Sequence, residues 1–317
     1  MTERRSWLLR RLALGALQTA GVVGLVFVLT EALPGDAAVA LAGDHPDPER
    51  IARIREIMRL DLPAGERFAE WVGGLFRGDL GTSLVSGRPV TEYLAAAFGP
   101  TLILTGLTVL LLVPVSVGLG VLAARREGGR TDRFISATTL GVYAVPEFAM
   151  GVLLIAVFAL RLGWLPPTAV GHGSDLLAEP AVLVLPVLVL LVRPVCSISR
   201  LVRAGMIDAM ASPYAAQARR YGVPGHRIRW GHALPNAVAP ASQQLARTCD
   251  WLLSGVIVVE ALFVIPGLGT VLIDAVAARD VPVIQGLAVV FGVVTVLLNL
   301  GADLVAQRFA PRAGVAA

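Results

Sequence analysis

The sequence predicts an all-helical, polytopic membrane protein with six transmembrane helices. Of its 317 residues, 56% are hydrophobic and only 16% are charged, whereas about a quarter of the residues in a soluble protein are charged. The apolar residues gather in runs of about 20 or more with few charges, and a helix of that length crosses a hydrocarbon core of about 30 Å. These observations outweigh the length, which by itself predicts one or two soluble domains.

Six apolar runs follow one another along the chain. They cover approximately Leu12–Leu33, Pro100–Ala124, Phe134–Leu160, Pro180–Ser199, Ala237–Phe263 and Val283–Val305. The first run follows four arginines, as the apolar part of a signal peptide would, but it is too long for one and no small-residue cleavage site precedes Pro34. We therefore predict an uncleaved helix there. The third run is interrupted by Glu147.

Helical signals also occur in the long segment between the first two runs. Asp47-Pro48-Glu49 offers an N-cap, a proline in the first turn and an acidic residue, and isoleucines then recur at helical spacing up to Ile57. A second stretch, Gly65–Phe76, places four large apolar residues on one face: Phe68, Trp71, Val72 and Leu75. We expect these helices to cap the outer side of the bundle or to lie at the interface.

The arginines predict the orientation, because loops rich in positive charge stay in the cytoplasm. They are concentrated before the first run, in loops 125–133 and 200–236, and after the last run, whereas Arg161 and Arg279 stand alone in the opposite loops. The predicted organisation is a cytoplasmic N-terminus and first helix (1–33), an external loop with short helices (34–99), a transmembrane core (100–307) and a cytoplasmic tail (308–317).

The composition excludes several kinds of site. All 27 basic residues are arginines, so the chain has no lysine for a Walker A phosphate loop or a Schiff base. The four histidines lack metal-ligand spacing, and no catalytic triad or carboxylate pair can be assembled from motifs. Cys196 and Cys249 lie in apolar runs and are interpreted as small core residues. The net charge of +4 is explained by cytoplasmic loops without nucleic acid. We predict no enzyme activity and no cofactor.

One basic segment between the fourth and fifth runs, YAAQARRYGVPGHRIRWGHALPN at 214–236, is too patterned for a disordered linker. The residues predict a helix over Ile207–Arg220 with Pro213 at a first turn, a break at Gly222, and a second short helix over about His226–Leu234 that ends at Pro235. One interpretation is a rigid knob on the cytoplasmic face that docks on a partner. The other is a basic hairpin that only anchors the bundle to anionic headgroups.

The residues of this segment resemble a known signature. Ala216-Gln217-Ala218, Gly222 and Leu234-Pro235 resemble the "EAA…G…LP" signature of permease subunits of binding-protein-dependent ABC importers. A wider match is similar to the dipeptide, oligopeptide and nickel branch of these permeases. It comprises YAAQARRYGV with GHALPNAVAP, and also LLRRL, LPGD, RGDLGTS and VVEALFVIPGLG followed by RDVPVIQG. The resemblance covers the chain from the first run to the last, in order and spacing.

The resemblance implies a MetI-like permease whose basic segment is the coupling helix pair that docks into a separate ATPase subunit. We call residues 214–236 the coupling segment. The positions that match or flank the signature are Tyr214, Ala216, Gln217, Ala218, Gly222, Leu234 and Pro235. Ala216 stands where the signature has Glu, so a contact made by that carboxylate is not expected. The implied partners are a second, non-identical permease, two ABC ATPase subunits or domains that bind ATP and Mg²⁺, and an extracytoplasmic solute-binding protein.

Polar residues inside the runs predict where a solute would pass, because charges at a helix centre cost about 2.5–3.5 kcal/mol. Three lie on one face of the fifth run at i, i+4 and i+7, and two interrupt the fourth and third: Gln243, Arg247, Asp250, Arg193 and Glu147. They would line a path for a peptide-like solute with charged ends. The alternatives are a structural Arg247–Asp250 pair, an Arg193 that reaches the cytoplasmic surface, and a Pro146-Glu147 kink.

Two other functions remain open at this point. A self-sufficient secondary transporter would need no ATPase, and a membrane-integral enzyme would need a catalytic constellation that the motifs do not supply. Association with an ATPase separates the permease from both. Peptides, nickel complexes and related small solutes are all compatible with the branch that the sequence resembles.

Overall fold

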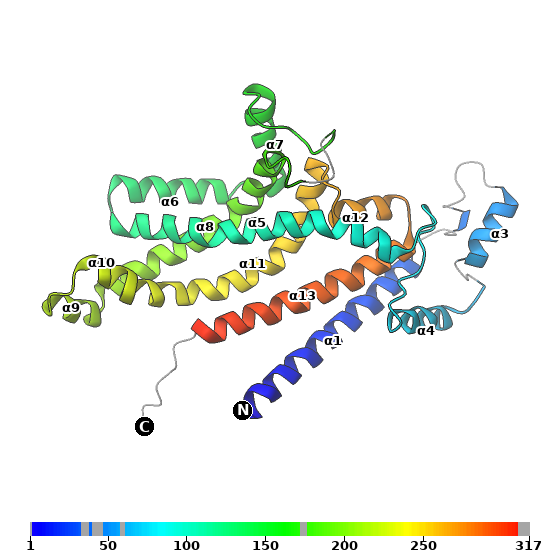
Figure 1. Cartoon of the computed structure of the whole chain (residues 1–317), viewed down its shortest axis with the longest axis horizontal. Coiled ribbons are helices and arrows are strands. Elements are labelled where there is room, and N and C mark those ends of the chain that lie inside the picture. The colour runs from blue at the N-terminus through cyan, green and yellow to red at the C-terminus, as the bar shows by residue number, and fades with distance from the viewer. Residues whose placement is uncertain (1, 33–37, 40–46, 58–60, 172–175, 310–317) are drawn as a thin grey trace. The chain divides into compact units, whose positions relative to one another are not determined.

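The computed structural model describes residues 2–32, 38–39, 47–57, 61–171 and 176–309 (Figure 1). Within these ranges, nothing is described of the side chains of residues 2–5, 7–9, 50, 54, 239–243, 245–247, 249–250 and 302–309. Every regular element in the described ranges is a helix, and one isolated bridge pairs Thr82 with Pro89. The prediction of an all-helical protein is therefore confirmed.

Among the described residues, four helices are individually long and apolar enough to cross a membrane: α1 (Thr2–Glu31), α5 (Val90–Arg125), α8 (Ala181–Ala211) and α13 (Val281–Phe309). Two bent pairs raise the number to six if each is one span. These are α6 (Arg130–Tyr143) with α7 (Glu147–Leu154) and the π-helix η1 (Ile155–Arg161), and the end of α11 (Leu234–Phe263) with α12 (Leu268–Ala277). The described part of the chain thus has four to six candidate spans, as expected of a polytopic protein.

The third predicted span is not one straight helix. Its two parts meet at an angle of 108°. Pro146 adopts an extended conformation directly before α7. A proline cannot donate the helical hydrogen bond, and it disfavours a helical conformation at Val145 before it. The predicted interruption at Glu147 is therefore a sharp bend, and Glu147 is the first residue after it.

The described residues form two compact units, 1–101 with 266–297 and 102–265 with 298–317. In the first unit, α1 packs against α13, where Gly292 faces Thr19. The start of α5 packs with α12 and α13 around Val90, Leu94 and Leu287. α4 (Ala64–Leu75) lies against α1 through Phe68 and Trp71, whose rings contact Phe27.

The loop helices begin where the sequence predicts. α3 (Pro48–Ile57) starts at Pro48, and the Asp47 carboxylate accepts the backbone N–H of Glu49 at 3.1 Å. α4 matches the predicted stretch Gly65–Phe76, and its apolar face is covered in part by α1. The helix α12 was not predicted from the sequence.

In the second unit, α8 is the central helix. It packs against α6, α7 and α11, and it is the most buried of the long spans. Two glycines allow close approach: a side chain at Gly120 of α5 would meet the Ser199 carbonyl, and one at Gly205 of α8 would meet the backbone of Ala237 in α11. These contacts hold the C-terminal half of α8 between two other helices.

Candidate functional site

The coupling segment follows α8 directly. Ser212 is extended and ends α8, and its hydroxyl accepts the backbone N–H of Ala215 at 3.4 Å. Pro213 occupies the first turn of α9 (Pro213–Arg220), where the missing N–H costs nothing because that donor would have no partner in any helix. The predicted helix over Ile207–Arg220 is therefore divided in two at Ser212.

Gly222 closes α9. Its φ is +76°, its N–H donates to the Arg219 carbonyl at 3.0 Å, and the next N–H, of Val223, donates to the Ala218 carbonyl at 3.1 Å. This pair of bonds is the Schellman motif, which requires a residue in the left-handed region and therefore favours glycine. The predicted break at Gly222 is present, with this physical cause.

The second arm of the coupling segment differs from the prediction. It begins at Pro224 and comprises α10 (Gly225–Arg227) and the π-helix η2 (Ile228–Ala233). The helix does not end at Pro235, because the backbone continues into α11 without a break. A proline crowds the carbonyl one turn earlier, and the wider π turns directly before Pro235 give that carbonyl room.

The two arms form one packed unit. α9 and η2 contact each other, and both contact α8. Ala215, Ile228 and Ala233 are completely buried, so these three small or aliphatic side chains form the inner face of the segment. Arg219 donates to the carbonyl of Met210 in α8, which ties the end of α9 back to the preceding helix.

The residues predicted for the coupling role lie partly on the exposed outer face of the coupling segment and partly toward its inner face. Tyr214, Gln217, Gly222 and Pro235 are exposed, whereas Ala216, Ala218 and Leu234 are half-buried. Tyr214 is also held in place, because the Asn236 amide lies 3.3 Å from its hydroxyl and donates to the His232 carbonyl at 2.8 Å.

The structure adds two exposed aromatic residues to this face. Tyr221 is 78% exposed and Trp230 is 56% exposed. Tyrosine, tryptophan and arginine are the residues most enriched at the energetic centres of protein interfaces. These two residues could have been predicted from the sequence, because each aromatic residue stands beside an arginine in an otherwise polar segment.

The predicted path residues are described only in part. The side chains of Gln243, Arg247 and Asp250 lie outside the described residues, so their shared face on α11 stays a prediction. Arg193 is exposed on α8, and its guanidinium carbon lies 5.1 Å from the centre of the Tyr143 ring. Arg200 approaches the same ring at 5.2 Å, so two arginines of α8 gather at the C-terminal end of α6.

Glu147 lies at the bend between α6 and α7. A side chain at Gly255 of α11 would come within 2.7 Å of its Oε1 atom, so the glycine makes room for the carboxylate. Oε1 is buried and has no hydrogen-bond partner among the described residues. Arg193 interacts electrostatically with Glu147. The structure therefore brings two of the five predicted path residues near each other.

Two motifs that lie far apart in the sequence meet in the first unit. Asp280, from RDVPVIQG, accepts the hydroxyl of Ser83 at 2.5 Å and the N–H of Leu84 at 3.1 Å, at the end of RGDLGTS. Both Ser83 and Asp280 are buried. Their spacing in the sequence gave no sign of this contact.

Comparison with known proteins assigns the chain to a family. The model of the binding-protein-dependent transport system inner membrane component matches residues 116–315, and the model of the N-terminal part of such membrane components matches residues 5–105. The chain belongs to this family. The first match contains the whole coupling segment and every predicted path residue.

Relatives of this permease match it over nearly its whole length. A probable peptide ABC transporter permease protein of Sinorhizobium fredii is 34% identical over 96% of this chain and 98% of its own. A glutathione transport system permease protein of Escherichia coli is 35% identical over the same shares. A glutathione transport system permease protein of Salmonella paratyphi A is also 35% identical over those shares.

Family membership decides between the functions left open by the sequence. The permease is the multi-pass inner-membrane component of an ABC import system that depends on a binding protein. It is a transport subunit and not an enzyme, and it works with other components of that system. A self-sufficient secondary transporter is not favoured, because such a transporter needs no binding protein.

Proposed function

We propose that this permease imports peptides or related small solutes of the dipeptide, oligopeptide or nickel type. It forms half of the translocation path, and a second, non-identical permease forms the other half. Two ABC ATPase subunits or domains bind ATP and Mg²⁺ and drive the cycle, and an extracytoplasmic solute-binding protein delivers the solute. This chain itself binds no cofactor.

The coupling segment carries the proposal. Its two arms pack on each other and on α8, and its outer face exposes Tyr221 and Trp230. A segment that only anchored the bundle to headgroups would need no Schellman closure and no buried inner face. Because the chain has no lysine for an ATP site of its own, the energy must arrive from another polypeptide, and this face supports docking there.

The orientation follows from the arginines. We place both termini, the loop at 125–133 and the coupling segment in the cytoplasm. Figure 1 shows that the connection between α5 and α6 and the helices α9 and α10 lie toward the same end of the second unit. A common end for the two arginine-rich loops supports a common side of the membrane.

The solute class rests on the relatives and on charge. The relatives are named for peptide and glutathione transport. The exposed Arg193 and the Glu147 carboxylate, one oxygen of which has no hydrogen-bond partner among the described residues, offer one group of each sign. We propose that these side chains, with Gln243, Arg247 and Asp250, face the path of a solute with charged ends. Uptake of a peptide and of its C-terminal amide by the importer with Arg193→Gln tests this, since only uptake of the free acid should fall.

The docking proposal is tested by purifying the complete importer through a tag on this chain. Deletion of residues 214–235 should abolish recovery of the ATPase while the chain still inserts into the membrane. Trp230→Ala should lower ATPase recovery by about tenfold or more, since truncation of an exposed aromatic at the centre of an interface has costs of that order. Trp164→Ala is the matched control, because Trp164 is 68% exposed but lies outside the coupling segment.

Normal ATPase recovery with the deleted chain would contradict the docking proposal. Equal losses with Trp230→Ala and Trp164→Ala would show that the loss of any exposed tryptophan disturbs the complex, and would also contradict it.

A further inference from the structure

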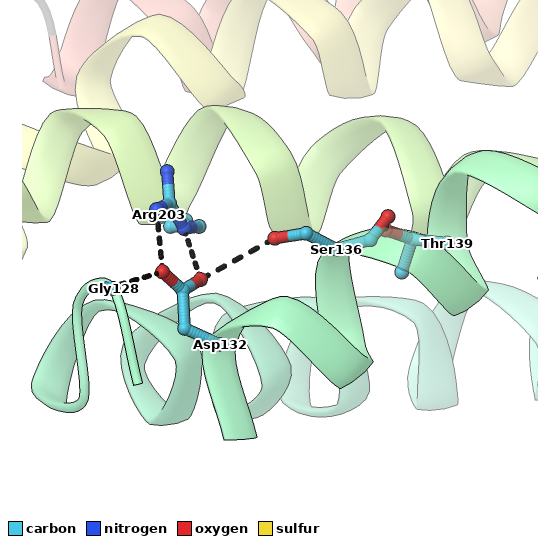
Figure 2. Close-up of polar contacts among 5 residues, drawn as sticks. All are labelled: Gly128, Asp132, Ser136, Thr139 and Arg203. Carbon is cyan, nitrogen blue, oxygen red and sulfur yellow. Dashed lines mark hydrogen bonds and ion pairs between the residues drawn. The ribbon is translucent and has the colours of Figure 1, made fainter. Parts of the chain in front are cut away.

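A buried carboxylate joins α6 to α8 close to the coupling segment. Asp132, in the first turn of α6, is only 3% exposed. Its two oxygens accept the Nε and Nη2 groups of Arg203 in α8 at 2.5 and 2.7 Å. Figure 2 shows this two-pronged contact, in which the planar guanidinium and the planar carboxylate face each other edge to edge.

The same carboxylate also accepts hydrogen bonds from the α5–α6 turn and from α6 itself. The N–H of Gly128 donates to Oδ2 at 2.9 Å, and the hydroxyl of Ser136 donates to Oδ1 at 3.3 Å (Figure 2). Gly128 has a φ of +71°, so the turn that connects α5 to α6 is shaped to present its N–H to Asp132. Asp132 therefore fixes three things at once: the α5–α6 turn, the start of α6, and α8.

Arg203 stands a short distance before the coupling segment on a continuous helix. From Arg203, α8 runs to Ala211, and α9 begins at Pro213 after the N-cap Ser212. At 1.5 Å per residue, this stretch is about 12 Å long. Met206 and Ala209 within it are buried, and Gly205 is pressed against Ala237 of α11. The stretch is thus packed over its length, so it can transmit a displacement of α9 as a rigid rod.

An exposed ion pair would do little, because water and salt screen it. Asp132 is buried, whereas the Arg203 side chain is 30% exposed. The carboxylate accepts hydrogen bonds from the guanidinium, a backbone N–H and a hydroxyl, so the contact is shielded from water better than a surface pair. Without this contact, the start of α6 would be held to α8 by apolar packing, which lets helices slide past each other. The stacking of Arg193 and Arg200 on Tyr143 lies at the opposite, C-terminal end of α6.

We propose that Asp132 and Arg203 are positioning residues for energy coupling. They make the α5–α6 turn and α6 move together with α8 when the ATPase displaces α9. This inference rests on the proposed function, because it takes α9 to be the point where the displacement is delivered.

The test uses the complete importer in proteoliposomes and measures solute uptake per ATP hydrolysed. Asp132→Asn should lower this ratio by about fivefold or more, the lower limit of typical coupling between sites, while hydrolysis persists. Arg203→Lys keeps the charge and loses the fork, so it should give a smaller loss. Asp208→Asn is the matched control: Asp208 is an exposed carboxylate on the same helix, and its replacement should leave the ratio unchanged.

A double variant, Asp132→Asn with Arg203→Gln, guards against misfolding, because it leaves no unpaired buried charge. It should assemble in normal amounts and still show the lowered ratio. An unchanged ratio in Asp132→Asn and in the double variant would overturn the inference, as would equal losses of uptake and hydrolysis, which indicate a structural role only. If the wild-type complex shows no ATP-driven uptake at all, the proposed function fails and the inference fails with it.

Discussion

At the residue scale, Gly222 shows how one position determines the shape of the coupling segment. Its left-handed backbone allows two N–H groups to close the end of α9 and sends the chain back toward α8. There is open space around it, since a side chain at this position would meet no atom within 4 Å. The constraint on Gly222 is therefore its backbone conformation and not crowding.

Gly222→Val should separate ATP hydrolysis from transport. A β-branched residue in the left-handed region costs on the order of 1–3 kcal/mol, so the turn should open and α9 should lose its fixed orientation. Membrane insertion should be normal, and uptake per ATP hydrolysed by the purified importer should fall severalfold.

Gly231→Val is the control for this substitution. Gly231 also has open space around it, but it lies in η2 with an ordinary helical φ, so valine should be tolerated there. Full transport by the Gly222→Val importer would count against the proposed role of the turn.

At the element scale, small residues decide how α8 is held. Gly120 of α5 lies against α8, and a side chain there would come within 2.7 Å of the Ser199 carbonyl and of the Cβ atom of Val202. Gly118, two residues earlier and therefore on nearly the opposite side of the helix, faces open space. The two glycines look equivalent in the sequence, yet only one of them sets the distance between the helices.

Gly120→Ala should therefore destabilise the permease, by about 1–3 kcal/mol for overpacking against backbone that cannot move aside. Gly118→Ala should be neutral or slightly stabilising, because alanine favours a helix more than glycine does. Thermal unfolding of the purified chain in detergent measures both. A lower melting temperature for Gly118→Ala than for Gly120→Ala would contradict the packing of α5 on α8.

The bend before α7 is a second feature of this scale. The sequence predicted one interrupted span because hydropathy continues through Pro146. Hydropathy measures how apolar a segment is, but it carries no information about the direction of the helix axis. The extended backbone at Pro146 changes that direction by 108°.

At the scale of the whole molecule, the proposed orientation makes opposite predictions for two loops. Val85 is 63% exposed in the segment proposed to be external, and Glu127 is exposed in the turn between α5 and α6. In a chain whose two native cysteines are replaced by alanine, a cysteine at position 85 should react with a membrane-impermeant maleimide applied from outside. A cysteine at position 127 should react only after the membrane is permeabilised.

Labelling in detergent is the control: both cysteines should react fully there, which shows that neither is protected by anything except the membrane. Labelling of position 127 from outside, with position 85 protected, would reverse the proposed topology. Labelling of both from one side would place the two loops on the same face and would contradict the number of crossings between them.

By itself, the sequence determined the helical class, the positions of the long apolar helices and the closure of α9 at Gly222. These depend on local properties: a run of apolar side chains, an N-cap at Asp47, a residue able to take a positive φ. The signature of the coupling segment was equally local, and the family match agrees with the importer permease that it implied.

Only the tertiary structure decided which distant groups meet. The pairs Asp132–Arg203 and Ser83–Asp280, the two arginines around Tyr143, and the difference between Gly118 and Gly120 all depend on how helices cross. A sequence pattern with a period of one helical turn fixes which residues share a face. The crossing of two helices depends on the side chains of both, so no single stretch contains the information that brings Asp132 to Arg203.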